Sequence, residues 1–338
     1  ISDSDLDTKV KASESALAPI DSDSSQIWLS VGEKITVRSA LYAIMLASAN
    51  DAANVIAEYV GGSMDNFVKM MNDKAKELGC VNTHFVNPHG LHNKKHYTCA
   101  HDMALIAQAA FQIPLFRKIT KTVEYKIPKT KYMKEDRWLV NHQKMLYEDG
   151  EFTYKDCEGG KTGFTAEAGY CYVGSLRRDE RTFIVALLAC GWPDNKGYKW
   201  KDTRRLMEYG LEHYHYREVY SNTAPDKLLV VDAFDPEIPY QTSEKISLRV
   251  KNSEKSKKIL LREKEEIRME IKTVKCKKAP VKKGEKAGTV SYYLADEKIA
   301  ENVVVTERAV EKRTLEKCMK IVTAKFLTLE SLVWYVKY

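Results

Sequence analysis

Two tripeptides in the chain contain residue types that could take part in chemistry. Ser48-Ala49-Asn50 offers a hydroxyl and a carboxamide, and Lys161-Thr162-Gly163 offers an ammonium group and a second hydroxyl. Such groups can transfer protons or bind an anionic ligand. Each tripeptide is common when taken alone. The signal lies in their combination, 113 positions apart, because each falls at a predicted junction between secondary-structure elements.

Ser48-Ala49-Asn50 lies between two predicted helices. Apolar residues recur at helical spacing over residues 35–47, with Thr36 as a plausible N-cap. A second apolar helix is predicted over residues 51–60, ending at Gly61 and Gly62. Two buried helices with so short a link require a tight, fixed turn at the tripeptide.

Lys161-Thr162-Gly163 precedes a predicted β-hairpin formed by strands 169–176 and 182–190 with a turn at 177–181. The remaining elements of this part are predicted as a strand at 8–12, helices at 64–78, 100–111 and 202–214, a loop at 82–98, and short strands and loops over 120–156. Helices thus lie between an early strand and a late antiparallel sheet. The pattern favours an α/β (α+β) domain over residues 1–218.

The C-terminal third has a different pattern. Short β-type runs are separated by charged turns, at residues 228–231, 246–250, 267–273, 289–294 and 301–306. They predict a small all-β domain over residues 226–308, with a junction near residues 220–225.

Residues 309–338 read as an amphipathic helix that is too short to span a bilayer. Its predicted apolar face comprises Leu315, Met319, Val322 and Phe326, whereas Lys312, Lys320 and Lys325 lie away from that face. Trp334, Tyr335 and Tyr338 suit a lipid boundary, so the helix is interpreted as an interfacial membrane anchor. The alternative is a helix docked on its own domain or on a partner.

The net charge of +7 is unevenly distributed. Residues 1–242 carry −3, residues 243–320 carry +9 and residues 321–338 carry +1. A nucleic-acid reader would place basic residues on its functional face, so nucleic acid is not an expected partner. The lysine-rich run at 272–286 is interpreted as a solvated β edge, with attraction to anionic lipid or wall polymer as a second hypothesis.

Cysteine and histidine patterns do not indicate a metal site. Seven cysteines include no C-x-x-C pair, and they are interpreted as buried thiols. Five of the eight histidines fall within residues 84–101 without the i, i+4 helical pair of a zinc protease. No metal and no other cofactor is expected.

Beyond the two tripeptides, four longer runs extend the pattern. They are SANDAA from Ser48, NPHGL from Asn87, HYTCAHDMALIA from His96 and GGKTGFTAEAG from Gly159. Together with the β domain and the terminal helix, they resemble the low-molecular-mass penicillin-binding proteins, the serine D-alanyl-D-alanine carboxypeptidases of peptidase family S11. The resemblance covers essentially the whole chain.

The resemblance implies a serine β-lactamase/transpeptidase-like fold and a set of site residues. Lys161 would supply positive charge beside Ser48, and Ser48 would relay a proton to the departing D-alanine. Asn50 would hold the substrate amide, and Thr162 and Thr165 would hold its carboxylate end. Gly163 would leave room for substrate along the strand, and the Thr165 amide would be one oxyanion donor. The implied partners are the peptidoglycan stem peptide and β-lactam antibiotics.

One part of the family pattern is missing from this sequence. No serine is followed three residues later by lysine, although the family's nucleophile and base form an S-x-x-K motif upstream of S-x-N. Thr8 and Lys11 have the spacing without the following apolar helix, and are interpreted as coincidence. The favoured interpretation is a truncated enzyme whose signal peptide, first strands and nucleophile helix precede Ile1.

Three functions therefore remain open. The leading hypothesis is an extracytoplasmic carboxypeptidase that removes the terminal D-alanine from stem pentapeptides through an acyl-enzyme, with the chain as given inactive. The first alternative is a catalytically inactive peptidoglycan-binding or scaffold protein. The second is a β-lactamase, which the extra β domain and the lack of an evident deacylating glutamate motif disfavour.

Overall fold

The structure, a computed structural model, describes residues 3–220, 223, 225–238, 240–251 and 257–335. The chain forms two compact units, Ile1–Glu212 and His213–Tyr338. The sequence placed the end of the first domain at residue 218. Tyr214–Glu218 instead forms a strand of the second unit, because it pairs along its length with Lys258–Arg262.

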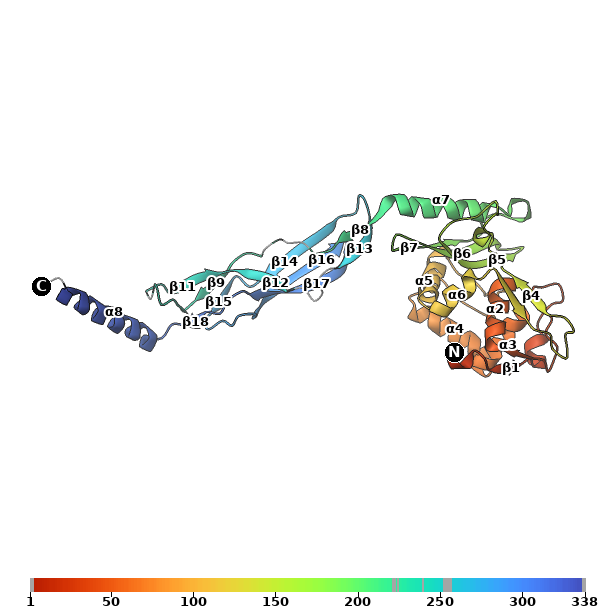
Figure 1. The fold of residues 1–338 in the computed structure, drawn as a ribbon, viewed down its shortest axis with the longest axis horizontal. Helices are drawn as coiled ribbons and strands as arrows, with labels where there is room; N and C mark the ends of the chain where they lie inside the picture. Colours follow the sequence, from red (N-terminus) through yellow and green to blue (C-terminus); the bar gives the residue numbers. More distant parts are fainter. Residues whose placement is uncertain (1–2, 221–222, 224, 239, 252–256, 336–338) are drawn as a thin grey trace. The chain divides into compact units, whose positions relative to one another are not determined.

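The first unit has three layers: one helix, a sheet, and a group of helices on the opposite face of the sheet (Figure 1). Its helices are α1 (Glu14–Leu17), α2 (Val37–Ala47), α3 (Asn50–Gly61), α4 (Met64–Glu77), α5 (Ala100–Phe111), α6 (Pro114–Lys121) and α7 (Tyr198–His213), with 3-10 turns at Asp3–Asp5, Lys144–Leu146 and Pro193–Asn195. Its strands are β1 (Lys9–Lys11), β2 (Lys34–Thr36), β3 (Glu124–Ile127), β4 (Arg137–Val140), β5 (Cys157–Thr165), β6 (Gly169–Arg178) and β7 (Arg181–Leu187).

The central sheet has the strand order β5-β6-β7 and is antiparallel. The predicted hairpin is present, with a tighter turn; β6 is longer than the predicted strand 169–176, and β7 ends before the predicted residue 190. Asp179 and Glu180 both have positive φ, 50° and 63°, which is the backbone of a two-residue hairpin turn. Within the described residues β5 pairs only with β6, so its other edge is open.

The helices that flank Ser48-Ala49-Asn50 form as predicted. Thr36 caps α2, since its side chain accepts a hydrogen bond from the Ser39 amide. The predicted end of α3 is also confirmed, because Gly62 adopts the left-handed conformation (φ 72°). Both helices bury their apolar faces in one core with β1 and β2.

Helix α6 was not predicted, because Pro114 interrupts the helical pattern of residues 112–121. Pro114 occupies the first turn, where its missing N–H costs no hydrogen bond. Ile119 is buried in the α2–α3 core, and the Thr120 hydroxyl donates to the Glu158 carbonyl on β5 (3.0 Å). Helix α6 therefore supports the strand that carries Lys161.

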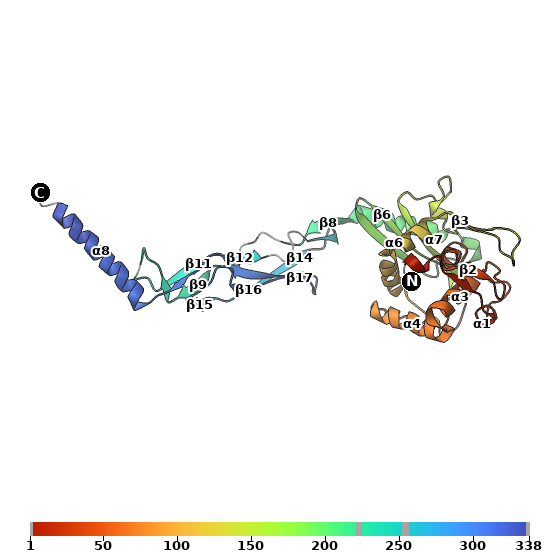
Figure 2. The same ribbon diagram turned by 60° about the horizontal axis from the view of Figure 1, so that its bottom comes forward.

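The second unit is an all-β domain followed by a helix. Its strands are β8 (Tyr214–Glu218), β9 (Leu228–Val231), β10 (Ala233–Phe234), β11 (Ser243–Ile246), β12 (Leu248–Lys251), β13 (Lys258–Arg262), β14 (Ile267–Thr273), β15 (Cys276–Lys278), β16 (Lys286–Leu294), β17 (Glu297–Thr306) and β18 (Glu311–Lys312). They form sheets β12-β17-β16-β14 and β11-β9-β15 and the pairs β13-β8 and β10-β18. Figure 2 shows β9, β11 and β15 side by side.

The terminal helix α8 spans Leu315–Tyr335 and begins later than the predicted residue 309. Residues 311–312 form β18 instead, because they pair with β10, far away in sequence. Leu315, Met319, Val322 and Phe326 are between 54% and 80% exposed, so these side chains do not dock on their own domain. The side chains of Trp334 and Tyr335, and all of Tyr338, lie outside the described residues.

Candidate active site

The turn between α2 and α3 directs the Ser48 hydroxyl toward β5. Ser48 is the residue after α2 and has left-handed backbone geometry (φ 55°), which is uncommon for a residue with a side chain. Its hydroxyl accepts a hydrogen bond of 2.5 Å from Lys161 Nζ. The structure therefore brings together the two tripeptides that the sequence singled out.

Lys161 is held in a largely buried position. Its ammonium group also donates to the Thr162 carbonyl at 2.6 Å, and no carboxylate among the described residues forms an ion pair with it. Burial lowers the pKa of Lys161 from its ordinary 10.5 to about 8. The group is therefore cationic at neutral pH, while its proton is held less tightly than in an exposed lysine.

His142 belongs to the same neighbourhood and was not singled out from the sequence. It follows β4 in the loop that leads to the Lys144–Leu146 turn. Although part of the His142 side chain is exposed, partial desolvation lowers its pKa, and the positive charge of Lys161 lowers it further. A neutral imidazole beside a cationic lysine leaves Lys161 as the main positive charge available to an anionic ligand.

The open edge of β5 can accept an extended ligand by strand addition. Two glycines in β5 are required by the fold: a Cβ on Gly159 would lie 2.2 Å from the Thr120 carbonyl oxygen, and one on Gly160 would lie 2.2 Å from the Val173 carbonyl oxygen. Gly163 differs, since the nearest atom to a Cβ there is Cys171 Cβ at 3.8 Å. The fold would tolerate a side chain at Gly163, so its absence leaves the strand surface open for a ligand.

The other three residues expected in the site lie on the same two elements. Asn50 is buried at the start of α3, and its backbone N–H donates to the Ser25 carbonyl at 2.9 Å. Thr162 lies on β5 beside Lys161. Thr165 ends β5, and its hydroxyl accepts from the Ala168 amide at 3.1 Å, so the hydroxyl proton remains available to a ligand. The ligand roles of these residues stay predictions.

A buried acidic residue fixes the loop in front of the Ser48–Asn50 turn. The Asp51 carboxylate accepts hydrogen bonds from the amides of Ile27 (3.2 Å), Leu29 (3.0 Å) and Ala52 (2.8 Å). Asp51 follows Asn50 directly, so the loop and the turn are held as one piece. Sequence reasoning missed this role, although an acid in the first turn of an apolar helix was its signal.

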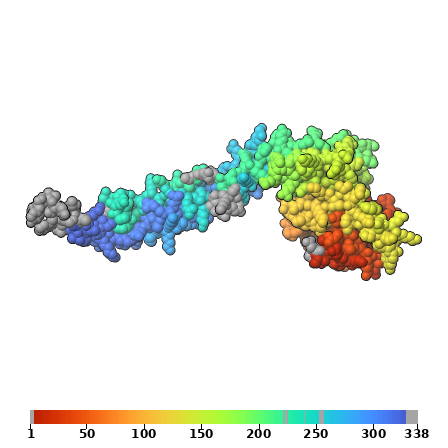
Figure 3. Space-filling model, viewed as in Figure 1, coloured from red at the N-terminus to blue at the C-terminus, as the bar shows by residue number. Residues whose placement is uncertain are grey.

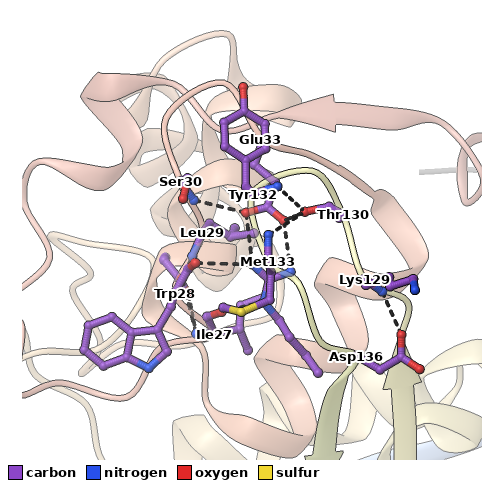
Figure 4. Close-up of polar contacts among 12 residues, drawn as sticks. Ile27, Trp28, Leu29, Ser30, Glu33, Lys129, Thr130, Tyr132, Met133 and Asp136 are labelled. Carbon is purple, nitrogen blue, oxygen red and sulfur yellow. Dashed lines mark hydrogen bonds and ion pairs between the residues drawn. The ribbon is translucent and has the colours of Figure 1, made fainter.

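A buried ion pair holds the same loop from the other side. Arg137 on β4 donates to both Glu33 oxygens (2.9 Å each) and to the carbonyls of Ile27 (2.7 Å) and Trp28 (3.2 Å). Figure 4 shows the polar contacts of Glu33, including the one with Thr130. In Figure 3, surface segments near the N-terminus (red) adjoin those near residues 130–150 (yellow).

The Glu33 carboxylate is ionised in this setting. Burial alone would raise its pKa, but hydrogen bonds from Arg137, Thr130 and the Ser30 amide outweigh burial and hold the pKa below its ordinary 4.5. The pair is separated by 104 positions in sequence, so no local pattern could reveal it.

The histidines of residues 84–101 do not gather into a metal site. Within the described residues no group of three or more histidine, cysteine or acidic side chains could hold a metal ion. His84 and His96 use ring nitrogens to contact the backbone of Lys95 and Val86. These contacts stabilise the loop itself.

Comparisons with known proteins agree on one family. The profile described as "D-alanyl-D-alanine carboxypeptidase" matches residues 2–190, and the profile described as "Penicillin-binding protein 5, C-terminal domain" matches residues 221–312. The D-alanyl-D-alanine carboxypeptidase DacF of Bacillus subtilis is 32% identical over 312 residues, which cover 91% of this chain and 74% of that protein.

Solved structures show the same similarity. The carboxypeptidase DacD of Francisella tularensis has a TM-score of 0.64 at 24% identity, with 91% of this chain and 82% of that chain covered, which shows the fold. A mutant of a Streptomyces DD-transpeptidase has a TM-score of 0.56 at 31% identity, with 63% and 82% covered. In the described part of the chain no helix is long and apolar enough to cross a membrane.

Proposed function

The chain belongs to the D-alanyl-D-alanine carboxypeptidase family, and we propose that its site binds the D-alanyl-D-alanine end of peptidoglycan stem peptides outside the cytoplasm. The reaction of the complete enzyme would transfer the penultimate D-alanyl group to a serine, release the terminal D-alanine, and hydrolyse the ester with water. The proteins of this family act on the cell wall, which is consistent with that location.

One observation carries the proposal most directly: Lys161 Nζ lies 2.5 Å from Ser48 Oγ, next to the open edge of β5. The lysine attracts the carboxylate of a peptide lying along that edge, and Thr162 and Thr165 supply hydroxyl donors. Because Ser48 accepts from Lys161, its own proton is free to reach the departing amine. These groups suit acyl transfer to and from a peptide with a free C-terminus.

The covalent step needs a serine paired with a base, and no serine in this sequence has a lysine three residues later. We therefore expect this chain to bind peptide and penicillin without forming an acyl adduct. Intact-mass spectrometry with a labelled penicillin is the test, and an adduct on any serine of Ile1–Tyr338 would show that the assignment is wrong. If a longer gene product also formed no acyl adduct, that result would favour the inactive scaffold protein.

Peptide binding tests the non-covalent part of the proposal. Acetyl-D-Ala-D-Ala should bind the chain, and isothermal titration should show weaker binding after Lys161→Met, which removes the cation at similar side-chain length. The control is Lys118→Met, because Lys118 is exposed on α6. Equal affinity in Lys161→Met and in the unaltered chain would contradict the proposed carboxylate role.

The exposed apolar face of α8 supports attachment to a membrane surface. Replacing Val322 and Phe326 with serine should lower sedimentation with phospholipid vesicles by at least about tenfold, given about 1.5–3 kcal/mol for each buried side chain. Glu316→Ala with Lys320→Ala removes an ion pair outside that face and serves as the control. Unchanged sedimentation of the serine variant would refute the anchor.

A further inference from the structure

Trp28 combines an unfavourable backbone with an exposed side chain. Its φ is 58°, the left-handed region that bulky residues avoid. Its indole is 59% exposed, so packing of the ring does not offset the backbone strain. Strain of this kind persists only where the surrounding structure imposes it, and it occurs preferentially at functional sites.

Buried charges on two sides impose the conformation of Trp28. The Asp51 carboxylate binds the amides that precede and follow it in sequence, those of Ile27 and Leu29. The Arg137 guanidinium binds the carbonyls of Ile27 and Trp28 itself. Figure 4 shows the indole of Trp28 pointing away from these polar contacts. The interior therefore fixes the backbone, and the ring is left for another partner.

The loop that presents the indole is attached to the turn that carries Ser48 and Asn50. The Ser25 carbonyl accepts from the Asn50 amide at 2.9 Å, and Asp51 is the next residue in the chain. The three residue steps from Ser25 to Trp28 extend over at most roughly 10 Å, and an extended ligand advances roughly 3.4 Å per residue. The Trp28 backbone therefore lies no farther from the Ser25–Asn50 contact than the length of about three extended ligand residues.

We propose that Trp28 is a specificity-determining residue, whose indole packs on the aliphatic side chain of the residue that precedes the D-alanyl-D-alanine pair. This inference rests on the proposed function. The indole face offers a large, rigid apolar surface, and the neighbouring Val31 is 55% exposed on the same loop. A long aliphatic side chain can cover this surface, whereas a D-alanine methyl group offers it little apolar area.

The indole ring also provides the readout. Protons held over an aromatic ring shift upfield in the NMR spectrum, so the ligand reports the contact directly. The probe is a synthetic pentapeptide that ends in Lys-D-Ala-D-Ala, added to the full chain. The lysine methylene protons of the bound peptide should move upfield, and the D-alanine methyl protons should not.

Trp28→Gly separates the contact from folding, because glycine accepts the left-handed backbone and should leave the melting temperature unchanged or higher. This variant should abolish the methylene shift and weaken pentapeptide binding about tenfold, as expected for one lost apolar side-chain contact. Affinity for acetyl-D-Ala-D-Ala should not change. Trp138→Ala is the matched control, since Trp138 is 64% exposed on β4.

The outcomes distinguish the two claims. Methylene shifts that persist in Trp28→Gly would overturn the proposed role of Trp28 and leave the proposed function standing. An equal loss of affinity for both peptides would do the same. If neither peptide binds the unaltered chain, both this inference and the proposed function fail.

Discussion

Replacing Lys161 with methionine should stabilise the first unit at neutral pH and abolish its carboxylate site. Burial lowers the pKa of Lys161 from 10.5 to about 8, so the folded protein favours the neutral amine. Below pH 8 both folded and unfolded chains hold the proton, and folding bears the full cost of burying the charge. Above pH 10.5 neither chain holds it. Between these values the stability of the unaltered chain rises with pH.

The size of the effect follows from the difference in pKa. A difference of roughly 2.5 in pKa corresponds to about 3 kcal/mol at pH 7. Methionine keeps the length of the side chain but loses the hydrogen bonds to Ser48 and to the Thr162 carbonyl, which together offset about 1 kcal/mol. The free energy of unfolding of Lys161→Met should therefore exceed that of the unaltered chain by about 2 kcal/mol at pH 7.

Urea unfolding at pH 7 and pH 10.5, followed by tryptophan fluorescence, measures this difference. At pH 10.5 the higher free energy of unfolding of Lys161→Met should vanish, or the variant should be less stable by about 1 kcal/mol. The buried amine is then neutral, so the loss of its hydrogen bonds is the main remaining difference. The exposed-lysine variant Lys118→Met should show no difference at either pH. A Lys161→Met chain that is less stable at pH 7, or a gap that is the same at both pH values, would refute the reasoning.

Four further predictions follow from the same contacts. Gly160→Ala should prevent folding of the first unit as judged by circular dichroism, because a Cβ there would lie 2.2 Å from the Val173 carbonyl oxygen. Gly163→Ala should fold and lose peptide binding in titration calorimetry, because the nearest atom to a Cβ at Gly163 is 3.8 Å away. Arg137→Met should lower the free energy of unfolding by about 3–5 kcal/mol in urea, since it leaves Glu33 buried and unpaired, and Glu33→Gln with Arg137→Met should recover part of the loss. Affinity for acetyl-D-Ala-D-Ala should fall as the pH rises through about 8, where Lys161 loses its charge. The stabilisation from ionised Glu33 is present above pH 4.5 and should be lost as the pH falls through the lowered pKa of Glu33. Hydrogen exchange of residues 25–33 should then accelerate before that of residues 157–165.

Local signals in the sequence located the turn that carries Ser48, because capping residues and glycines act within a few positions. Thr36 caps the start of α2, and Gly62 ends α3, as their chemistry requires. The contact between Ser48 and Lys161 could be anticipated only through the family resemblance. Nothing in the composition or the periodicity of either tripeptide specifies a 2.5 Å approach across 113 positions.

Long-range pairing explains what the sequence did not reveal. Residues 309–314 read as the start of a helix, yet β18 forms because β10 offers it a partner. Strand β13 contains charged residues at both ends and has no regular alternation, but it pairs with β8 over five positions. No local pattern in the sequence marks Glu33 or Arg137 as buried. Both are buried because they form an ion pair with each other and because Arg137 also donates hydrogen bonds to the carbonyls of Ile27 and Trp28.

Different forces therefore hold the two halves of the candidate site. The β5 half is fixed by strand pairing and by glycines that let β5 approach α6 and β6 closely. The turn half is fixed by three buried charges, of Asp51, Glu33 and Arg137, that bind loop backbone rather than ligand. Neither Ser48 nor Lys161 takes part in these charge contacts, so their own hydrogen bond can exchange for ligand contacts without loosening the frame. Protonation of Lys161 can consequently change ligand affinity while the positions of both halves stay the same.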